Sequence, residues 1–113
     1  MRVHGVIGSV EDRDVLLFDD EIITGESMLD GAGAVLARGA RSVHAGCVHG
    51  TLAPGAAGRI IDSELESLVV TDTIPQSEAG KACAKIKIVS IAPLLAEAIR
   101  RIHHSDSVSS LFV

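Results

Sequence analysis

Short aliphatic runs separated by helical stretches limit what this chain can fold into more than any other feature of its sequence. Three of the runs are typical of buried strands and a fourth partly alternates with polar residues; in chain order they are Val15–Phe18, Val43–Val48, Leu68–Val70 and Ile86–Val89. Strands of a parallel sheet that helices cover read as nearly continuous aliphatic runs. The sequence therefore predicts four strands of this kind.

Apolar residues at helical spacing predict the elements between and after these strands. Helices are expected over Ser27–Arg38, over the short stretch Ala56–Ile61 and over Pro93–His103. Gly39 would end the first helix, and Thr73–Ala84 is expected to be the longest loop. This order of elements predicts an α/β fold, a three-layer, mostly parallel sheet flanked by helices, in which residues 1–113 form a single domain.

Composition narrows the classes of partner. The net charge of −5 gives no basic footprint for nucleic acid, and no apolar run reaches the ~20 residues of a membrane span. Cys47 and Cys83 are expected to be reduced thiols, and the five histidines show no zinc spacing. We therefore expect a cytoplasmic protein without a metal site of its own. Because 47% of this short chain is hydrophobic, we also expect exposed apolar surface and self-association.

Polar residues follow three of the predicted strands, within Asp19–Ser27, His49–Thr51 and Thr71–Thr73. Open parallel sheets bind ligands outside the carboxyl ends of their strands, so these segments are expected to share one site. For His49 the alternatives are a ligand contact and a structural role in its loop. For Asp72 they are a ligand contact and a hydrogen bond within its loop.

The segment after the first strand carries the chemistry of this site. A loop that opens a helix offers unpaired N–H groups and the positive end of the helix dipole, both of which favour a phosphate. Gly25 would let the backbone approach that phosphate, and the hydroxyls of Thr24 and Ser27 can donate to its oxygens. The carboxylates of Asp19 and Asp20 suit sugar hydroxyls or magnesium-bound water. The alternative is that the acids merely end a strand and that Ser27 is a helix N-cap.

This segment resembles the signature of the phosphoribosyltransferases, in which a strand and two acids precede a D-T-G-G-T-like loop. It departs from that signature at Ile23, Glu26 and Ser27. Glu26 adds negative charge beside an anion site, a small loss only if its side chain points to solvent. The resemblance implies that the two acids meet the ribose hydroxyls and that the loop holds the 5-phosphate, which makes the predicted ribose 5-phosphate-binding set Asp19, Asp20, Ile23, Thr24, Gly25, Glu26 and Ser27.

The rest of the chain resembles the carboxy-terminal half of the ribose-phosphate pyrophosphokinases (PRPP synthetases). The resemblance runs from about Val6 to the end and is carried by Val48–Leu52, Val69–Pro75, Leu95–His103 and the final S-V-S-x-L-F at Ser107–Phe112. It implies a phosphoribosyltransferase-like fold that binds ribose 5-phosphate or PRPP in an enzyme that moves pyrophosphate from ATP to the sugar with Mg²⁺. It also implies a homo-oligomer or association with a complete synthetase.

The same resemblance places the ATP contacts and the basic catalytic loop in sequence upstream of this chain. We therefore expect no catalytic residue in this half and no activity from the chain alone. One alternative is a non-catalytic regulatory or binding module that joins a complete synthetase. A small base phosphoribosyltransferase is the weaker alternative, because no base-binding hood is evident.

The final residues alternate polar and apolar side chains, which predicts an extended tail with two faces. By resemblance, Ser107, Ser109 and Phe112 bind a regulatory phosphate or ADP; the alternative is that the tail only anchors the last helix. Hydroxyls alone hold phosphate poorly without a cation or a helix end beside them, so a partner subunit is expected to supply the charge. Phe112 is expected to dock, either on this domain or on a neighbouring subunit.

Overall fold

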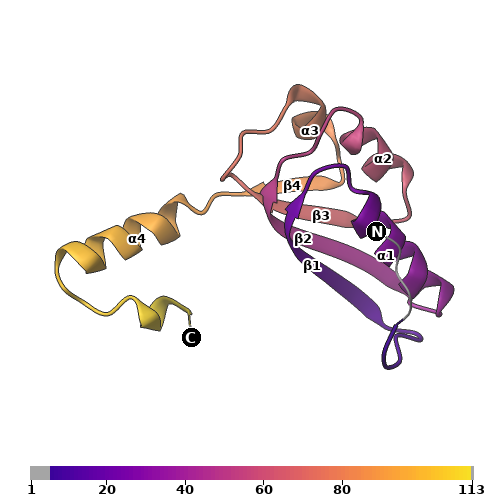
Figure 1. Ribbon diagram of the computed structural model, residues 1–113, viewed down its shortest axis with the longest axis horizontal. Helices are drawn as coiled ribbons and strands as arrows, with labels where there is room; N and C mark the ends of the chain where they lie inside the picture. Colours follow the sequence, from indigo (N-terminus) through magenta and orange to yellow (C-terminus); the bar gives the residue numbers. More distant parts are fainter. Residues whose placement is uncertain (1–5, 113) are drawn as a thin grey trace.

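A four-stranded parallel sheet forms the centre of the protein, whose computed structural model describes residues 6–112 (Figure 1). The strands lie in the order β1-β2-β3-β4, and every neighbouring pair is parallel. The predicted α/β class with a parallel sheet and helices is confirmed. The elements in chain order are β1 Asp14–Ile22, α1 Glu26–Ala37, β2 Ser42–Gly50, α2 Ala56–Asp62, β3 Ser67–Thr71, α3 Glu78–Ala82, β4 Ile86–Val89, α4 Ala92–His103 and the 3-10 helix η1 Ser109–Phe112.

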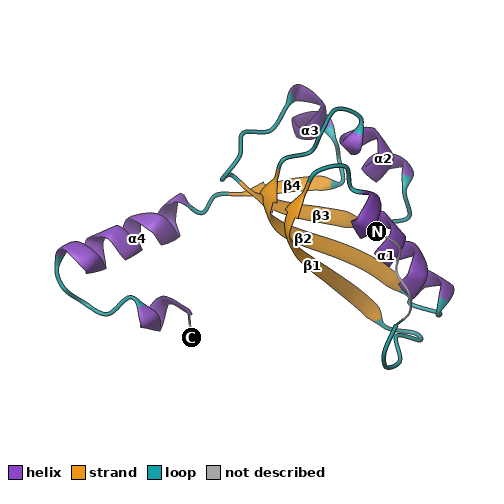
Figure 2. Ribbon diagram, viewed as in Figure 1, coloured by secondary structure: helices purple, strands orange, loops and turns teal. Residues whose placement is uncertain are grey.

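One face of the sheet carries the hydrophobic core. Val43 on β2 is fully buried, and so are Leu68 and Val70 on β3. Met28, Ala32 and Val35 of α1 and Ala56 and Ile60 of α2 belong to the same buried cluster. Figure 2 shows α1, α2 and α3 gathered on this side of the sheet. Their aliphatic side chains meet those of alternate strand residues, because successive strand residues point to opposite faces.

The other face of the sheet is open in the described residues. Leu16 of β1 is 56% exposed, and Val69, in the middle of β3, is 36% exposed. α4 has no buried residue and extends away from the sheet as an arm (Figures 1 and 2). Only Ser90 and Ile91 separate β4 from α4. None of the helices in residues 6–112 is long and apolar enough to cross a membrane.

Three elements differ from their predicted form. β1 runs on through Ile22, so Asp19 and Asp20 are strand residues rather than the start of a loop. α3 lies inside the predicted loop Thr73–Ala84; its five residues are too few to show a helical period, and the Ser77 hydroxyl caps it by accepting the Gly80 N–H at 3.1 Å. The tail ends in a 3-10 helix, so the prediction of an extended tail was wrong.

Candidate functional site

The connection from β1 to α1 is a tight turn at a helix start. Gly25 is the N-cap of α1 and has φ 86°, a left-handed conformation that a residue with a Cβ rarely adopts. α1 begins at Glu26, so the alternative prediction that Ser27 is the N-cap was wrong: Ser27 is the second residue of the helix. The Thr24 hydroxyl accepts the N–H of Glu26 at 3.3 Å. Its own proton therefore remains free to be donated to another group.

Three successive carbonyls of this turn are bonded to the segment that follows β2. The carbonyl of Ile22 accepts the N–H of Leu52 at 3.1 Å, and the carbonyl of Ile23 accepts the N–H of Ala53 at 2.7 Å. The carbonyl of Thr24 accepts Nε of Arg59, on α2, at 3.1 Å. Negative carbonyl oxygens are thus held on one side of the turn. The first-turn N–H groups of α1, which have no partner within a helix, form its other side.

A cavity of about 200 Å³ lies against this turn, and the structure brings most of the predicted site residues to it. Its lining is made of Asp19, Glu21, Ile22, Ile23, Thr24, Gly25, Ser27 and Met28. Of the predicted set, Asp20 and Glu26 do not line the cavity. Glu26 is exposed on the first turn of α1, which is the orientation in which its charge harms an anion site least.

The two aspartates occupy different environments because β1 continues through them. Asp19 pairs in register with the buried Cys47 of β2 and lines the cavity, whereas Asp20 does not line it. A side-chain hydrogen bond with Asp19, followed by the backbone N–H of Glu21, lowers the pKa of Asp20. Burial raises the pKa of the Cys47 thiol, which with Cys83 is free and buried, as the predicted reduced thiols should be.

The ends of the neighbouring strands meet β1 at the same edge of the sheet. The Thr51 hydroxyl donates to Oε2 of Glu21 at 2.9 Å, so the residue after β2 touches the cavity wall. His49 Nδ1 lies 2.8 Å from the Thr73 hydroxyl, a contact of the kind that its structural alternative requires. The three polar segments therefore converge, although their contacts are mostly with one another.

Asp72 serves the connection between β4 and α4. Its Oδ1 accepts the N–H of Ile91 at 2.9 Å, and hydrogen bonds from the Ser90 side chain and then from this N–H lower its pKa. Of the two roles considered for Asp72, hydrogen bonding within the protein is the one that the geometry shows.

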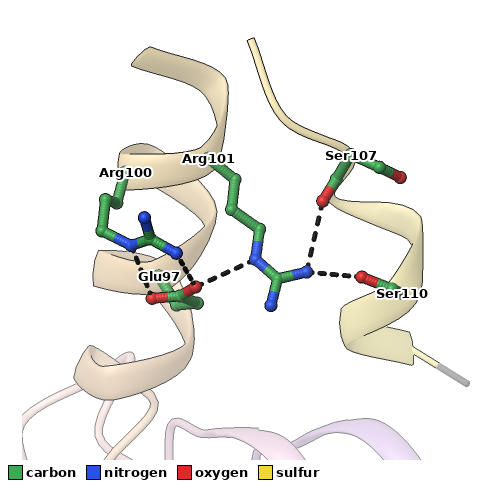
Figure 3. A network of polar contacts seen from close by, with 5 residues as sticks. All are labelled: Glu97, Arg100, Arg101, Ser107 and Ser110. Carbon is green, nitrogen blue, oxygen red and sulfur yellow. Dashed lines mark hydrogen bonds and ion pairs between the residues drawn. The ribbon is translucent and has the colours of Figure 1, made fainter. Parts of the chain in front are cut away.

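The tail is tied to α4 by Arg101 (Figure 3). Arg101 donates from Nη1 to the carbonyl of Ser107 at 3.2 Å and to the Ser110 hydroxyl, and from Nε to Glu97 at 2.9 Å. The Ser107 and Ser109 hydroxyls lie 2.8 Å apart. Arg101 is thus a cation of this chain beside the tail, and its Nε is paired with Glu97. Phe112 is 72% exposed and does not dock on this domain.

Sequence reasoning missed two residues at the loop. Arg59 was placed in a short candidate helix with no role, because a hydrogen bond across 35 residues to the carbonyl of Thr24 leaves no mark in a local pattern. Glu21 was read as one more acid in a polar run. The only sequence signal for its place at the cavity is its alternation with Asp19 along a strand that was predicted to be shorter.

The fold defines a class: a parallel α/β domain with a cavity at the carboxyl edge of its sheet, beside the start of a helix. Within that class the chain matches the family described as phosphoribosyl synthetase-associated domain over residues 3–113, and it belongs to that family. The ribose-phosphate pyrophosphokinase of Caulobacter vibrioides is 49% identical over 111 residues, which cover 98% of this chain and 36% of that relative. The corresponding enzyme of Bordetella parapertussis is 48% identical, with 98% of this chain and 36% of the relative covered.

A solved structure supports the same assignment. The crystal structure of phosphoribosylpyrophosphate synthetase from Mycobacterium smegmatis superposes with a TM-score of 0.83 at 32% identity, covering 89% of this chain and 34% of that one. The chain thus spans only about a third of the length of the relatives that it matches, as the 36% and 34% coverages show.

Proposed function

We propose that this chain binds ribose 5-phosphate or PRPP at the cavity beside the β1–α1 turn and supplies the sugar-phosphate site of a ribose-phosphate pyrophosphokinase. The observation that carries this proposal is the polarity of the turn. The carbonyls of Ile22, Ile23 and Thr24 are all bonded to the segment after β2 or to α2, so the N-terminal end of α1 is left as the side of the turn that meets the cavity.

The phosphate end of the ligand would lie at Thr24–Ser27. Helix starts bind phosphate through their free N–H groups and through the positive end of the dipole. The hydroxyls of Thr24 and Ser27 add two donors to these N–H groups, and Gly25 has no Cβ to hold the phosphate off. Arg59 stabilises the arrangement from behind through the Thr24 carbonyl.

The sugar end would lie toward Asp19, whose carboxylate is an acceptor for ribose hydroxyls. Mg²⁺ is usually held by one or two carboxylates together with substrate phosphates, and Asp19 and Glu21 give this cavity a donor set of that kind. A bound Mg²⁺ would neutralise charge on the pyrophosphate. Asp20, which does not line the cavity, is the weaker candidate of the two aspartates for the sugar.

We propose that the whole enzyme transfers pyrophosphate from ATP to the anomeric hydroxyl of the sugar; the relatives are named ribose-phosphate pyrophosphokinases, which supports the class of this reaction. The share of this chain in that reaction would be to position the sugar, which is a large part of the acceleration available to a two-substrate transfer. The alternative is a non-catalytic module that associates with a complete synthetase; its description as a synthetase-associated domain is what favours it.

The tail could form a second, regulatory anion site. Arg101 stands beside Ser107 and Ser110, and with Ser109 and Phe112 these are the residues that would bind a phosphate or ADP. The carboxylate of Glu97 already forms an ion pair with Arg101, so a bound anion would have to compete with Glu97 for this guanidinium. We expect deletion of residues 107–113 to lower the melting temperature; the regulatory role requires that it also abolish an ADP or phosphate response of a complete synthetase.

The proposal is tested by titrating the labelled chain with ribose 5-phosphate while following backbone amide chemical shifts. We expect the largest shifts at Thr24–Ser27. Ribose and inorganic phosphate, titrated separately, divide the site into its two ends. Asp19→Asn should weaken binding more than Asp20→Asn, its neighbour and matched control, without unfolding the chain. Shifts confined to residues far from β1 and α1 would exclude the proposed site.

A further inference from the structure

Glu21 is an acid of the cavity wall that the phosphate end of the proposed site does not use. It lies two residues after Asp19 on β1, and both side chains line the cavity beside the β1–α1 turn. Among the described residues, the lining contains no other charged side chain. A carboxylate only accepts hydrogen bonds and repels anions. The part of the cavity away from the helix start therefore suits a group that donates hydrogen bonds and carries no negative charge.

The carboxylate of Asp19 is already engaged in part by its neighbour in the chain. Its Oδ1 accepts the N–H of Asp20 at 2.8 Å, and the two side chains also share a hydrogen bond. Oδ1 of Asp20 in turn accepts the N–H of Glu21 at 2.9 Å, and Asp20 does not line the cavity. A ribose ring presents two neighbouring hydroxyls that can both donate, so a second acceptor is required besides Asp19.

A hydroxyl from the end of the neighbouring strand holds Glu21 in place. The Thr51 hydroxyl donates to Oε2 of Glu21 at 2.9 Å, and the backbone of Glu21 pairs in register with His49 of β2. Within residues 6–112 no hydrogen bond to the other carboxylate oxygen, Oε1, is found. The protein thus fixes one oxygen and leaves the other as an acceptor, so the group is oriented before a ligand binds.

We propose that Glu21, positioned by Thr51, is the second acceptor for the vicinal hydroxyls of the ribose ring, and that it selects a sugar phosphate with both hydroxyls over a deoxy sugar phosphate. The inference rests on the proposed function, because it concerns the sugar end of the same cavity. A site built to hydrogen-bond a substrate hydroxyl rejects the analogue that lacks it, since its acceptor is left unpaired. A hydrogen bond to a charged group is strong enough to change a dissociation constant by roughly tenfold.

Titration of the full chain with ribose 5-phosphate and with its 2-deoxy and 3-deoxy analogues tests the proposal. Backbone amide shifts give the dissociation constants, and EDTA is present so that no divalent cation bridges the carboxylates. We expect the parent chain to bind ribose 5-phosphate about tenfold more tightly than either analogue. Glu21→Ala should abolish the preference over one analogue and should not weaken binding of inorganic phosphate, which has no sugar hydroxyl. The matched control is Glu66→Ala, the same change at an exposed acid just before β3, at the opposite edge of the sheet. Circular dichroism checks that each variant is folded.

Thr51→Val tests the positioning role, because it removes the hydroxyl and keeps the shape of the side chain. It should reduce the same preference that Glu21→Ala abolishes, Thr51→Ser should restore it, and Thr51→Val should add nothing in a Glu21→Ala background. If Thr51→Val keeps the full preference, Thr51 does not position Glu21. A parent chain that binds ribose 5-phosphate at the turn, combined with a Glu21→Ala variant that keeps both preferences, overturns the role of Glu21 and leaves the proposed function standing. A parent chain that does not bind ribose 5-phosphate refutes both.

Discussion

Replacing Gly25 by alanine tests the backbone conformation of the β1–α1 turn without adding a steric clash. Gly25 has φ 86°, and a Cβ added there would meet no atom within 4 Å. The cost of Gly25→Ala is therefore conformational alone, about 1–2 kcal/mol for placing an L-residue in the left-handed region. With a urea m-value of about 1.5 kcal/mol/M, the unfolding midpoint should fall by roughly 1 M.

The matched control lies in the helix that the turn opens. Gly33 of α1 also has open space at the position of its Cβ, but its φ lies outside the left-handed region. Gly33→Ala should therefore stabilise the protein by about 0.5–1 kcal/mol, since glycine is unfavourable within a helix. The same substitution is therefore expected to lower the free energy of unfolding at Gly25, the N-cap of α1, and to raise it at Gly33, within α1.

Urea unfolding of both variants, at one fixed protein concentration because self-association would add to stability, gives the two values. Equal effects of the two substitutions, or a Gly25→Ala variant as stable as the parent chain, would refute the left-handed turn. The turn positions the proposed phosphate site, so Gly25→Ala should also weaken ribose 5-phosphate binding, whereas Gly33→Ala should leave it unchanged.

Three further predictions follow from the site and the tail. The purified chain should form no PRPP from ATP and ribose 5-phosphate, because the cavity lining contains no lysine or arginine to neutralise the transferred charge; robust ATP-dependent product formation would contradict this. Arg59→Gln should speed hydrogen exchange in the turn and weaken sugar-phosphate binding by about 0.5–1.5 kcal/mol, since Nε no longer holds the Thr24 carbonyl; unchanged exchange would show that this bond is not needed. Arg100 and then Arg101 lower the pKa of Glu97 to about 2 from an ordinary 4.5, so the ion pairs of Glu97 with these arginines are complete above pH 4.5 and are lost as the pH falls toward 2. The Nε chemical shift of Arg101 should follow that window, and it should not do so in Glu97→Gln.

The sheet could be predicted because each strand contains a short aliphatic run that is visible in the local sequence. β4 has the predicted limits, and the cores of the other strands lie within the predicted runs. The ends of the strands could not be predicted as well, because polar residues can continue a strand when a neighbouring strand forms backbone hydrogen bonds with them. Pairing of Glu21 with His49 and of Ile22 with Gly50 extends β1 beyond its aliphatic part. The bonds between β2 and the turn are equally non-local, and for that reason Arg59 had no signal.

The predicted tail failed for a related reason. Alternation of polar and apolar residues over six positions is compatible with a strand, but a strand needs a partner edge. Arg101 instead offers one guanidinium to the Ser107 carbonyl and the Ser110 hydroxyl, and Val108 accepts the N–H of Leu111 at 3.1 Å. A single cation nine residues away in sequence thus selects a turn of 3-10 helix over an extended tail.

The pair of adjacent acids shows most clearly what sequence and structure each contribute. As a motif, Asp19 and Asp20 are equivalent acceptors beside a phosphate loop. In the structure only Asp19 lines the cavity, although β1 continues through both residues. Asp20→Asn is therefore the matched control for Asp19→Asn, because it removes the same charge from the adjacent residue. Equal losses of ribose 5-phosphate binding in the two variants would show that the charge of the pair matters and not the place of Asp19 at the cavity.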